Sequence, residues 1–202
     1  MQKPVWIYFL FFVLPVSAQN SLNVEALDKY FEKARTDWNT PGMAVGIMYN
    51  DTILLAKGYG TLSSESEKPV DIYTKFGIAS NTKAFTAAAL AMLVDEKKIL
   101  WHDKVIKYIP YFKLYDDYVT KEMTIRDILS HRTGLKTFSG DLIWYNSDYK
   151  PKEIIEHARF LKPGHGFREK YGYSNIMYLV AGQIIEEVSG KSYEDFIEER
   201  IF

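Results

Sequence analysis

The chain has 202 residues, of which 47% are hydrophobic and 25% are charged, and its formal net charge is −1. This is ordinary globular composition, and the mixed charges argue against a nucleic-acid or anionic-membrane surface. Cysteine is absent, which excludes disulfides and thiolate metal sites. The four histidines show no metal-binding spacing, so we expect no metal and no cofactor.

A secretory signal peptide is predicted over residues 1–18. Lys3 precedes an apolar run over residues 5–16, and Ser17 and Ala18 are small residues of the kind found at cleavage sites. The alternative is a membrane anchor, but the run is shorter than the about 20 residues that cross a bilayer. We therefore predict export to the periplasm or the extracellular space, with no stable membrane anchor after cleavage.

The next part of the chain predicts one helix and a β-hairpin. Asn23 is suited to cap the helix, because apolar residues recur at helical spacing after it. Asn50-Asp51 suits a tight turn between two strand-like runs. The expected elements are a helix over 23–35, strands over 43–49 and 52–59, and a polar loop over 61–70.

The rest of the chain predicts helices. Residues 84–94 are nearly all apolar or alanine, which is typical of a helix buried on all sides, and Ser80 is expected to start it. Thr124 and Asp127 match a capping box. The other expected helices run from 124 to about 131, from 151 to about 161, from 175 to 188, and from 192 onward.

These elements predict an α/β (α+β) protein. Residues 19–79 would hold the helix and hairpin, and residues 80–202 the helical part. A hairpin alone is marginally stable, and no convincing strand follows residue 80. We therefore expect the domain over 19–202 to be incomplete, with the remaining strands of its sheet missing.

The pattern Ser-x-x-Lys occurs twice, as Ser80–Lys83 and as Ser147–Lys150. By itself the pattern is a weak signal. Lys150 precedes Pro151, which disfavours helix at that point. Ser80 lies at the start of the predicted apolar helix, where residues three apart share a face with about 5–6 Å between their Cβ atoms. The first pair is therefore the better candidate site.

A serine hydroxyl becomes a good nucleophile when a base removes its proton. Burial disfavours an ammonium ion, so Lys83 is a candidate base for Ser80, although Ser80 could also cap the helix while Lys83 reaches solvent. In Tyr173-Ser174-Asn175, a phenol beside an amine could carry a proton, and an amide could hold a substrate amide. Alternatively, Tyr173 packs and Asn175 caps the next helix.

Several segments share an order and a spacing with a known family. They are Ser80-Asn-Thr-Lys83, His131-Arg-Thr-Gly-Leu135, and Pro163-Gly164 leading to Tyr173-Ser-Asn175. Together they resemble the serine β-lactamase-related family, which includes class C β-lactamases, penicillin-binding proteins, D-Ala-D-Ala carboxypeptidases and esterases of the same fold. The resemblance covers about residues 23–202 and implies a β-lactamase/transpeptidase-like fold.

The resemblance also implies roles for individual residues. Ser80 resembles the acylated nucleophile, Lys83 its base partner, Tyr173 the second proton-transfer group, and Asn175 the contact to the substrate amide. The implied function is a serine hydrolase that forms an acyl-enzyme on a β-lactam, a D-amino-acid peptide or a small ester. The alternative is a non-catalytic relative that binds cell-wall peptide or a protein partner.

One departure from the family pattern concerns its third motif, Lys-Thr-Gly or His-x-Gly on a late strand. Arg132-Thr133-Gly134 looks similar but precedes the tyrosine motif. The absent strand would supply one oxyanion donor, and losing such a donor costs about 2.7–4 kcal/mol. We therefore expect the 202-residue chain alone to be poorly stable and weakly active, or inactive.

Overall fold

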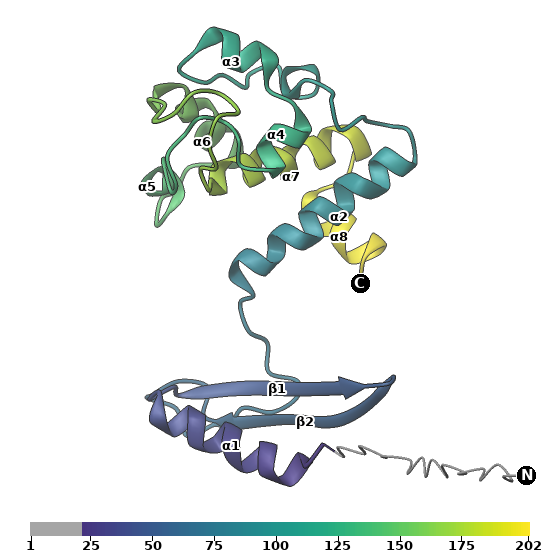
Figure 1. The fold of residues 1–202 in the computed structure, drawn as a ribbon, viewed down its shortest axis with the longest axis vertical. Helices are drawn as coiled ribbons and strands as arrows, with labels where there is room; N and C mark the ends of the chain where they lie inside the picture. The colour runs from purple at the N-terminus through teal and green to yellow at the C-terminus, as the bar shows by residue number, and fades with distance from the viewer. Residues whose placement is uncertain (1–21) are drawn as a thin grey trace, which may run out of the picture. The chain divides into compact units, whose positions relative to one another are not determined.

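The computed structural model describes residues 22–202 (Figure 1). The predicted signal peptide over residues 1–18 lies outside the described residues. The chain forms two compact units, which divide between Phe76 and Gly77. Within the described part, no helix is both long enough and apolar enough to cross a bilayer.

The first unit contains one helix and a β-hairpin, as predicted. Its elements are α1 (Val24–Asp37), β1 (Gly42–Tyr49) and β2 (Thr52–Gly60). The side chain of Asn23 caps α1 by accepting a hydrogen bond from the Ala26 amide. Asn50 and Asp51 both have positive φ angles, 45° and 57°, as a tight hairpin turn requires.

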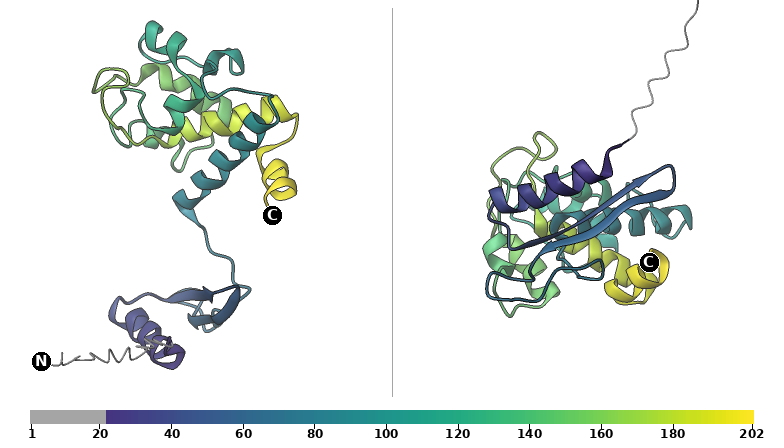
Figure 2. Two further views of the ribbon diagram at one scale, coloured as in Figure 1. Left: turned by 45° about the vertical axis from the view of Figure 1, so that its right-hand side comes forward. Right: turned by 90° about the horizontal axis from the view of Figure 1, so that it is seen from below.

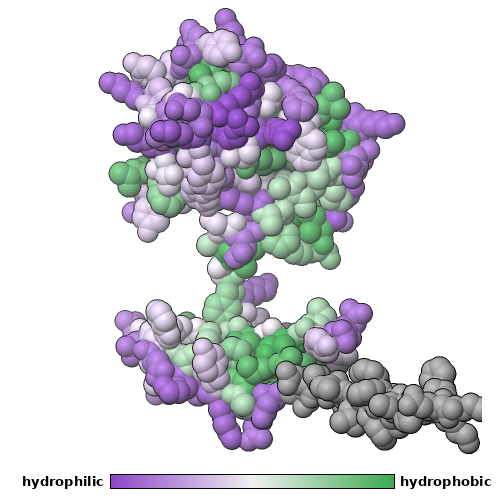
Figure 3. Space-filling view, in the orientation of Figure 1, coloured by the Kyte–Doolittle hydropathy of each residue, from purple (hydrophilic) through white to green (hydrophobic). Residues whose placement is uncertain are grey.

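Helix α1 lies along the hairpin (Figure 2). Asp28 joins the two, because its carboxylate accepts hydrogen bonds from Tyr59 Oη at 2.7 Å and from Lys57 Nζ at 2.7 Å. Several apolar side chains of the hairpin are nevertheless exposed, including Met48 and Ile53, and Figure 3 shows apolar residues on this unit.

The second unit is helical and is built around one central helix. Its α-helices are α2 (Thr82–Asp95), α3 (Asp117–Glu122), α4 (Ile125–Leu129), α5 (Asp141–Trp144), α6 (Pro151–His157), α7 (Asn175–Ser189) and α8 (Tyr193–Arg200). Helix α7 contacts α2, α4, α6 and α8. Six of its hydrophobic residues are fully buried, namely Ile176, Met177, Val180, Ala181, Ile184 and Ile185. The predicted α/β class is therefore confirmed, with a helix and hairpin followed by a helical body.

The predicted helix ends are also observed. Thr124 Oγ1 accepts a hydrogen bond from the Asp127 amide, and Asp127 Oδ2 accepts one from the Thr124 amide, so the capping box is confirmed. Gly190 ends α7 in the left-handed conformation, with a φ of 72°. Ser192 caps α8 by accepting from the Asp195 amide.

The prediction that the first apolar helix is buried on all sides is wrong for the described chain. Within α2 the buried residues lie on one face, and Ala84 and Ala88 are exposed. Figure 3 shows apolar residues on the side of this unit that carries α2 and α8. A nearly uniform apolar sequence gives no contrast between faces, so it could not indicate which face packs.

Candidate active site

Ser80 lies in a short turn before α2. The sequence predicted that Ser80 starts the helix, but α2 begins at Thr82, and Ser80 belongs to the 3₁₀ turn η1 (Ala79–Asn81). Ala79, the first residue of this turn, has a positive φ of 45°, so regular helix does not extend to it. Lys83 Nζ nevertheless donates a hydrogen bond to Ser80 Oγ at 3.3 Å. The structure thus brings the two residues together through a turn that leads into the helix.

Tyr173 completes a three-residue contact. Its phenolic oxygen lies 2.5 Å from Ser80 Oγ, and Lys83 Nζ lies 4.7 Å from the centre of its ring. The adjacent Lys83 amine, followed by the hydrogen bond with Ser80, holds the pKa of Tyr173 below the ordinary phenol value. A phenol with a lowered pKa beside a hydroxyl and an amine is suited to move protons between them.

Asn175 binds Lys83 from the other side. Its Oδ1 atom accepts a hydrogen bond from Lys83 Nζ at 2.6 Å, and its Nδ2 atom donates to Asp141 Oδ2 at 2.9 Å. The alternative reading, in which Asn175 caps α7, is wrong. Ser174 occupies the cap position without a side-chain cap bond, and Asn175 is the first helical residue.

The four predicted residues therefore converge within one unit, although they come from two distant segments. Ser80 is exposed, whereas Lys83, Tyr173 and Asn175 are partly buried. A cavity of about 620 Å³ opens beside Ser80, Lys83 and Asn175. Its walls include Trp144, Ile154, Leu179 and Tyr193. The nucleophile candidate is thus open to a substrate, while its partners are held in place.

His131 binds the backbone amides on both sides of Tyr173. Its carbonyl oxygen accepts a hydrogen bond from the Gly172 amide at 2.9 Å, and its Nδ1 atom accepts one from the Ser174 amide at 3.1 Å. Burial, followed by the charge of Lys83, lowers the pKa of His131. The imidazole must be neutral for this contact, because Nδ1 needs a free lone pair to accept the hydrogen bond from the Ser174 amide.

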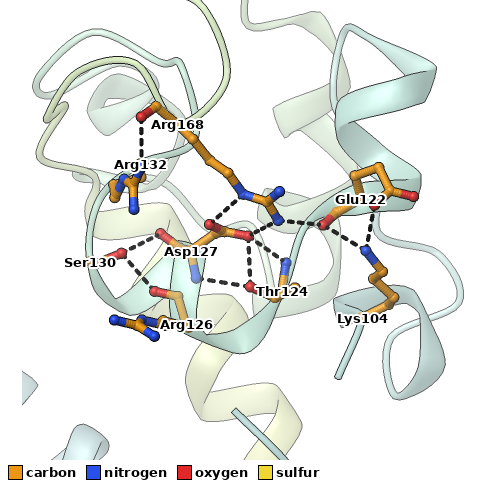
Figure 4. Close-up of polar contacts among 8 residues, drawn as sticks. All are labelled: Lys104, Glu122, Thr124, Arg126, Asp127, Ser130, Arg132 and Arg168. Atoms are coloured by element: carbon orange, nitrogen blue, oxygen red, sulfur yellow. Dashed lines mark hydrogen bonds and ion pairs between the residues drawn. The ribbon is translucent and has the colours of Figure 1, made fainter. Parts of the chain in front are cut away.

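Arg168, in the loop before Tyr173, is bonded to Asp127 and Arg132 on either side of His131 in the sequence (Figure 4). Arg168 donates to both carboxylate oxygens of Asp127, at 2.9 Å and 2.7 Å, and its carbonyl oxygen accepts from Arg132 Nη2 at 2.8 Å. Burial alone would raise the pKa of Asp127, but hydrogen bonds from Arg168 and Thr124 outweigh it and lower the pKa. The loop is thereby fixed to α4.

The second Ser-x-x-Lys pair is not brought together. Ser147 Oγ donates to the Ile143 carbonyl oxygen at 2.8 Å, and the Lys150 amide donates to Glu153 Oε2 at 2.7 Å. Both residues are exposed. No group of three or more His, Asp or Glu side chains within residues 22–202 is arranged to hold a metal ion.

Comparison with known proteins identifies the family. The sequence model of the Beta-lactamase family matches residues 27–202. The unguisins hydrolase ungD' of Aspergillus campestris is 36% identical over 82% of this chain and 32% of its own length. The protein flp of Staphylococcus aureus is 30% identical over 86% of this chain and 35% of its own length.

The fold is shared with solved structures as well. The octameric penicillin-binding protein homologue from Pyrococcus abyssi superposes with a TM-score of 0.74 at 30% identity, covering 89% of this chain and 42% of that one. The chain belongs to the β-lactamase family of serine hydrolases and has its β-lactamase/transpeptidase-like fold. It spans about a third of the length of the curated relatives it matches.

Proposed function

We propose that the protein is a serine hydrolase that forms an acyl-enzyme through Ser80. One observation carries the proposal: Ser80 Oγ is within hydrogen-bonding distance of both Tyr173 Oη, at 2.5 Å, and Lys83 Nζ, at 3.3 Å. A serine hydroxyl in contact with a phenol and an amine is placed to exchange its proton with them and to act as a nucleophile. Membership of a family of serine hydrolases supports the same conclusion.

In the proposed reaction, Ser80 Oγ attacks the carbonyl carbon of an ester or amide. The hydroxyl proton passes to the Tyr173 and Lys83 pair, and the Ser80 amide donates a hydrogen bond to the developing oxyanion. The tetrahedral intermediate then breaks its bond to the alcohol or amine, which leaves with a proton from the same pair. Water attacks the ester on Ser80, loses its proton to the pair, and releases the acid.

We propose Asn175 as the contact to the acyl part of the substrate, because its amide lies beside Lys83 at the wall of the cavity. Three substrate classes fit the reaction: a β-lactam, a D-amino-acid peptide and a small ester. The names of two relatives support hydrolysis and an encounter with β-lactams, since one relative is an unguisins hydrolase and another is a penicillin-binding protein homologue.

We also propose that the protein is exported. The apolar run over residues 5–16, with a positive residue before it and small residues after it, supports this proposal. An exported hydrolase would meet cell-wall peptides and β-lactams outside the cytoplasm.

Covalent labelling tests the acyl-enzyme and separates the substrate classes. The purified protein and its Ser80→Ala variant are incubated with a fluorescent penicillin and with a fluorophosphonate. Labelling by the penicillin that is lost in the variant supports a β-lactam-reactive enzyme, whereas labelling by the fluorophosphonate alone supports an esterase or amidase. Labelling of neither kind, or labelling that persists in Ser80→Ala, contradicts the proposal; the absence of labelling favours the binding relative.

A further inference from the structure

Asp141 has a defined place in the site, although no sequence pattern pointed to it. It is the first residue of α5, and its Oδ2 atom accepts the hydrogen bond from Asn175 Nδ2 at 2.9 Å. The same Asn175 amide accepts from Lys83 Nζ through its oxygen. A single amide therefore links a carboxylate on one side to an amine on the other.

The direction of the Asn175 amide depends on this carboxylate. The oxygen and nitrogen ends of an asparagine amide have nearly the same shape, but one accepts and the other donates hydrogen bonds. An ionised carboxylate only accepts, so Asp141 requires the nitrogen end to face it. The oxygen end then faces Lys83, and a reversed amide would present N–H groups to the amine.

Asp141 is itself held in place by several contacts. Trp144 Nε1 donates to its second carboxylate oxygen, Oδ1, at 3.3 Å. Gly140, directly before it, has a φ of 85°, and an added Cβ there would lie 2.6 Å from side-chain atoms of Ile176 and Leu161. A left-handed glycine pressed against Ile176 and Leu161 fixes the start of α5.

The loop before α5 is also bonded to the proposed proton carrier. The Phe138 amide donates to the Tyr173 carbonyl oxygen at 2.8 Å, and the Tyr173 amide donates to Thr137 Oγ1 at 3.2 Å. Residues 137–141 are thus bonded to the backbone of Tyr173, and they place the Asp141 carboxylate beside Asn175. The contact between Asp141 and Asn175 is therefore part of the fold of the site rather than a chance surface pair.

We propose that Asp141 is a positioning residue whose carboxylate fixes the direction of the Asn175 amide and thereby aims the Lys83 amine at Ser80. The role deepens the proposed function and rests on it, because the aimed amine matters only if Ser80 is acylated. In this role Asp141 contacts neither Ser80 nor the substrate. It acts through Asn175 alone.

The first test measures the inactivation kinetics of the full chain with a fluorophosphonate. Because a misdirected amine slows the reaction of Ser80 without changing the cavity, Asp141→Ala should lower the maximal labelling rate about tenfold, the size expected for one lost hydrogen bond to a charged group. The probe concentration for half-maximal rate should not change. The control is Asp148→Ala, which removes an exposed acidic residue further along the same segment and should change neither constant.

A charge exchange separates direction from simple structural damage. In Asn175→Asp, the carboxylates at positions 141 and 175 face each other. In the double variant Asp141→Asn/Asn175→Asp, the carboxylate at position 175 faces Lys83, and the amide at position 141 donates a hydrogen bond to that carboxylate. The double variant should label faster than Asn175→Asp alone. Additive losses, with the double variant slower than either single variant, would overturn the proposal.

A second readout does not depend on Ser80 chemistry. The side-chain amide proton of Asn175 that faces Asp141, assigned with Asn175→Asp, should resonate downfield of ordinary asparagine amide protons in the wild type, because it is bonded to a carboxylate. This downfield shift should be lost in Asp141→Ala and persist in Asp148→Ala. An ordinary chemical shift in the wild type would overturn the role of Asp141, whereas the downfield shift without any Ser80 labelling would instead reject the proposed hydrolase function.

Discussion

The hydroxyl oxygen of Ser80 lies 2.5 Å from the phenolic oxygen of Tyr173, although 93 positions separate the two residues in the sequence. The distance is in the range of charge-assisted O–H···O bonds. Lys83 adds a hydrogen bond to the same hydroxyl and lowers the pKa of the phenol. A proton that leaves Ser80 therefore has an acceptor already in contact.

Replacing Tyr173 with phenylalanine should remove proton transfer but keep the fold. The expected loss in kcat/KM for a chromogenic ester is about 10²–10⁴-fold, the usual contribution of general acid–base catalysis. Ring contacts to His131 and Phe138 would be retained, since they need no hydroxyl. The melting temperature, measured by circular dichroism, should change little.

The pH dependence of the same assay provides a further check on Tyr173. Because the pKa of Tyr173 is lowered, the rise in kcat/KM that accompanies its ionisation should occur below the ordinary phenol value of about 10. It should vanish in Tyr173→Phe and persist in Tyr115→Phe, which alters an exposed tyrosine. Equal activity of the two variants would show that Tyr173 carries no proton.

His131 should make the stability of the protein depend on pH. Its folded-state pKa is lowered by burial and by Lys83, so the unfolded chain binds the proton more readily. The contribution of His131 to folding stability is therefore complete above a pH of about 6.5, the pKa of histidine in the unfolded chain. It is lost as the pH falls below about 6.5 toward the folded-state pKa. The free energy of unfolding, measured with denaturant from about pH 8 down to about pH 5, should decrease over this range.

The matched variant for this experiment is His131→Asn, since asparagine tolerates the positive φ of 58° at this position. This variant should be less stable than the wild type at high pH. Below a pH of about 6.5, its free energy of unfolding should change less with pH than that of the wild type. The ionisable groups facing His131 are Lys83 and the tyrosines Tyr171, Tyr173 and Tyr178. His102→Asn, at an exposed position, should leave the wild-type curve unchanged.

Asp127 should stabilise the site loop at neutral pH. Asp127→Asn removes the charge that binds Arg168 and should cost about 2 kcal/mol of unfolding free energy, the range for a hydrogen bond to a charged group. Because the folded-state pKa of Asp127 is lowered, the wild-type contribution is present above about 3.9 and is lost as the pH falls through the folded pKa. Urea unfolding at about pH 7 measures the cost of Asp127→Asn. Urea unfolding of the wild type at about pH 3, which is about one unit below the unfolded pKa of aspartate, measures the loss of this contribution in acid.

The control for this variant is Asp117→Asn. Asp117 is exposed and pairs only with Lys113 in the described chain, and such surface pairs contribute about 0–1 kcal/mol. If both variants lose the same stability, the partly buried pair between Asp127 and Arg168 does not fix the loop.

The features that the sequence predicted best depend on neighbouring residues. The capping box of Thr124 and Asp127 and the approach of Lys83 to Ser80 follow from spacings of three residues. The pattern Tyr173-Ser174-Asn175 offered a proton carrier, but the family resemblance was needed to place it beside Ser80, because periodicity carries no information about a contact across 93 positions. Its catalytic role stays a prediction.

The features that were missed depend on tertiary contacts. Helix α5 is four residues long, too short to give a hydrophobic period, so the sequence offered no reason to single out Asp141. Gly140 before it was the one available signal, since glycine is favoured in the left-handed conformation. The packed face of α2 was missed because its composition is apolar on every side.

The most direct test of the account is to locate the covalent adduct. The protein is treated with a fluorophosphonate or a penicillin, its intact mass is measured, and the modified peptide is sequenced by mass spectrometry. We predict a single adduct on Ser80 with at least one of the two probes, and none in Ser80→Ala. An adduct on Ser147 or another residue, or an unmodified protein with both probes, would contradict the assignment of Ser80 as the acylated nucleophile.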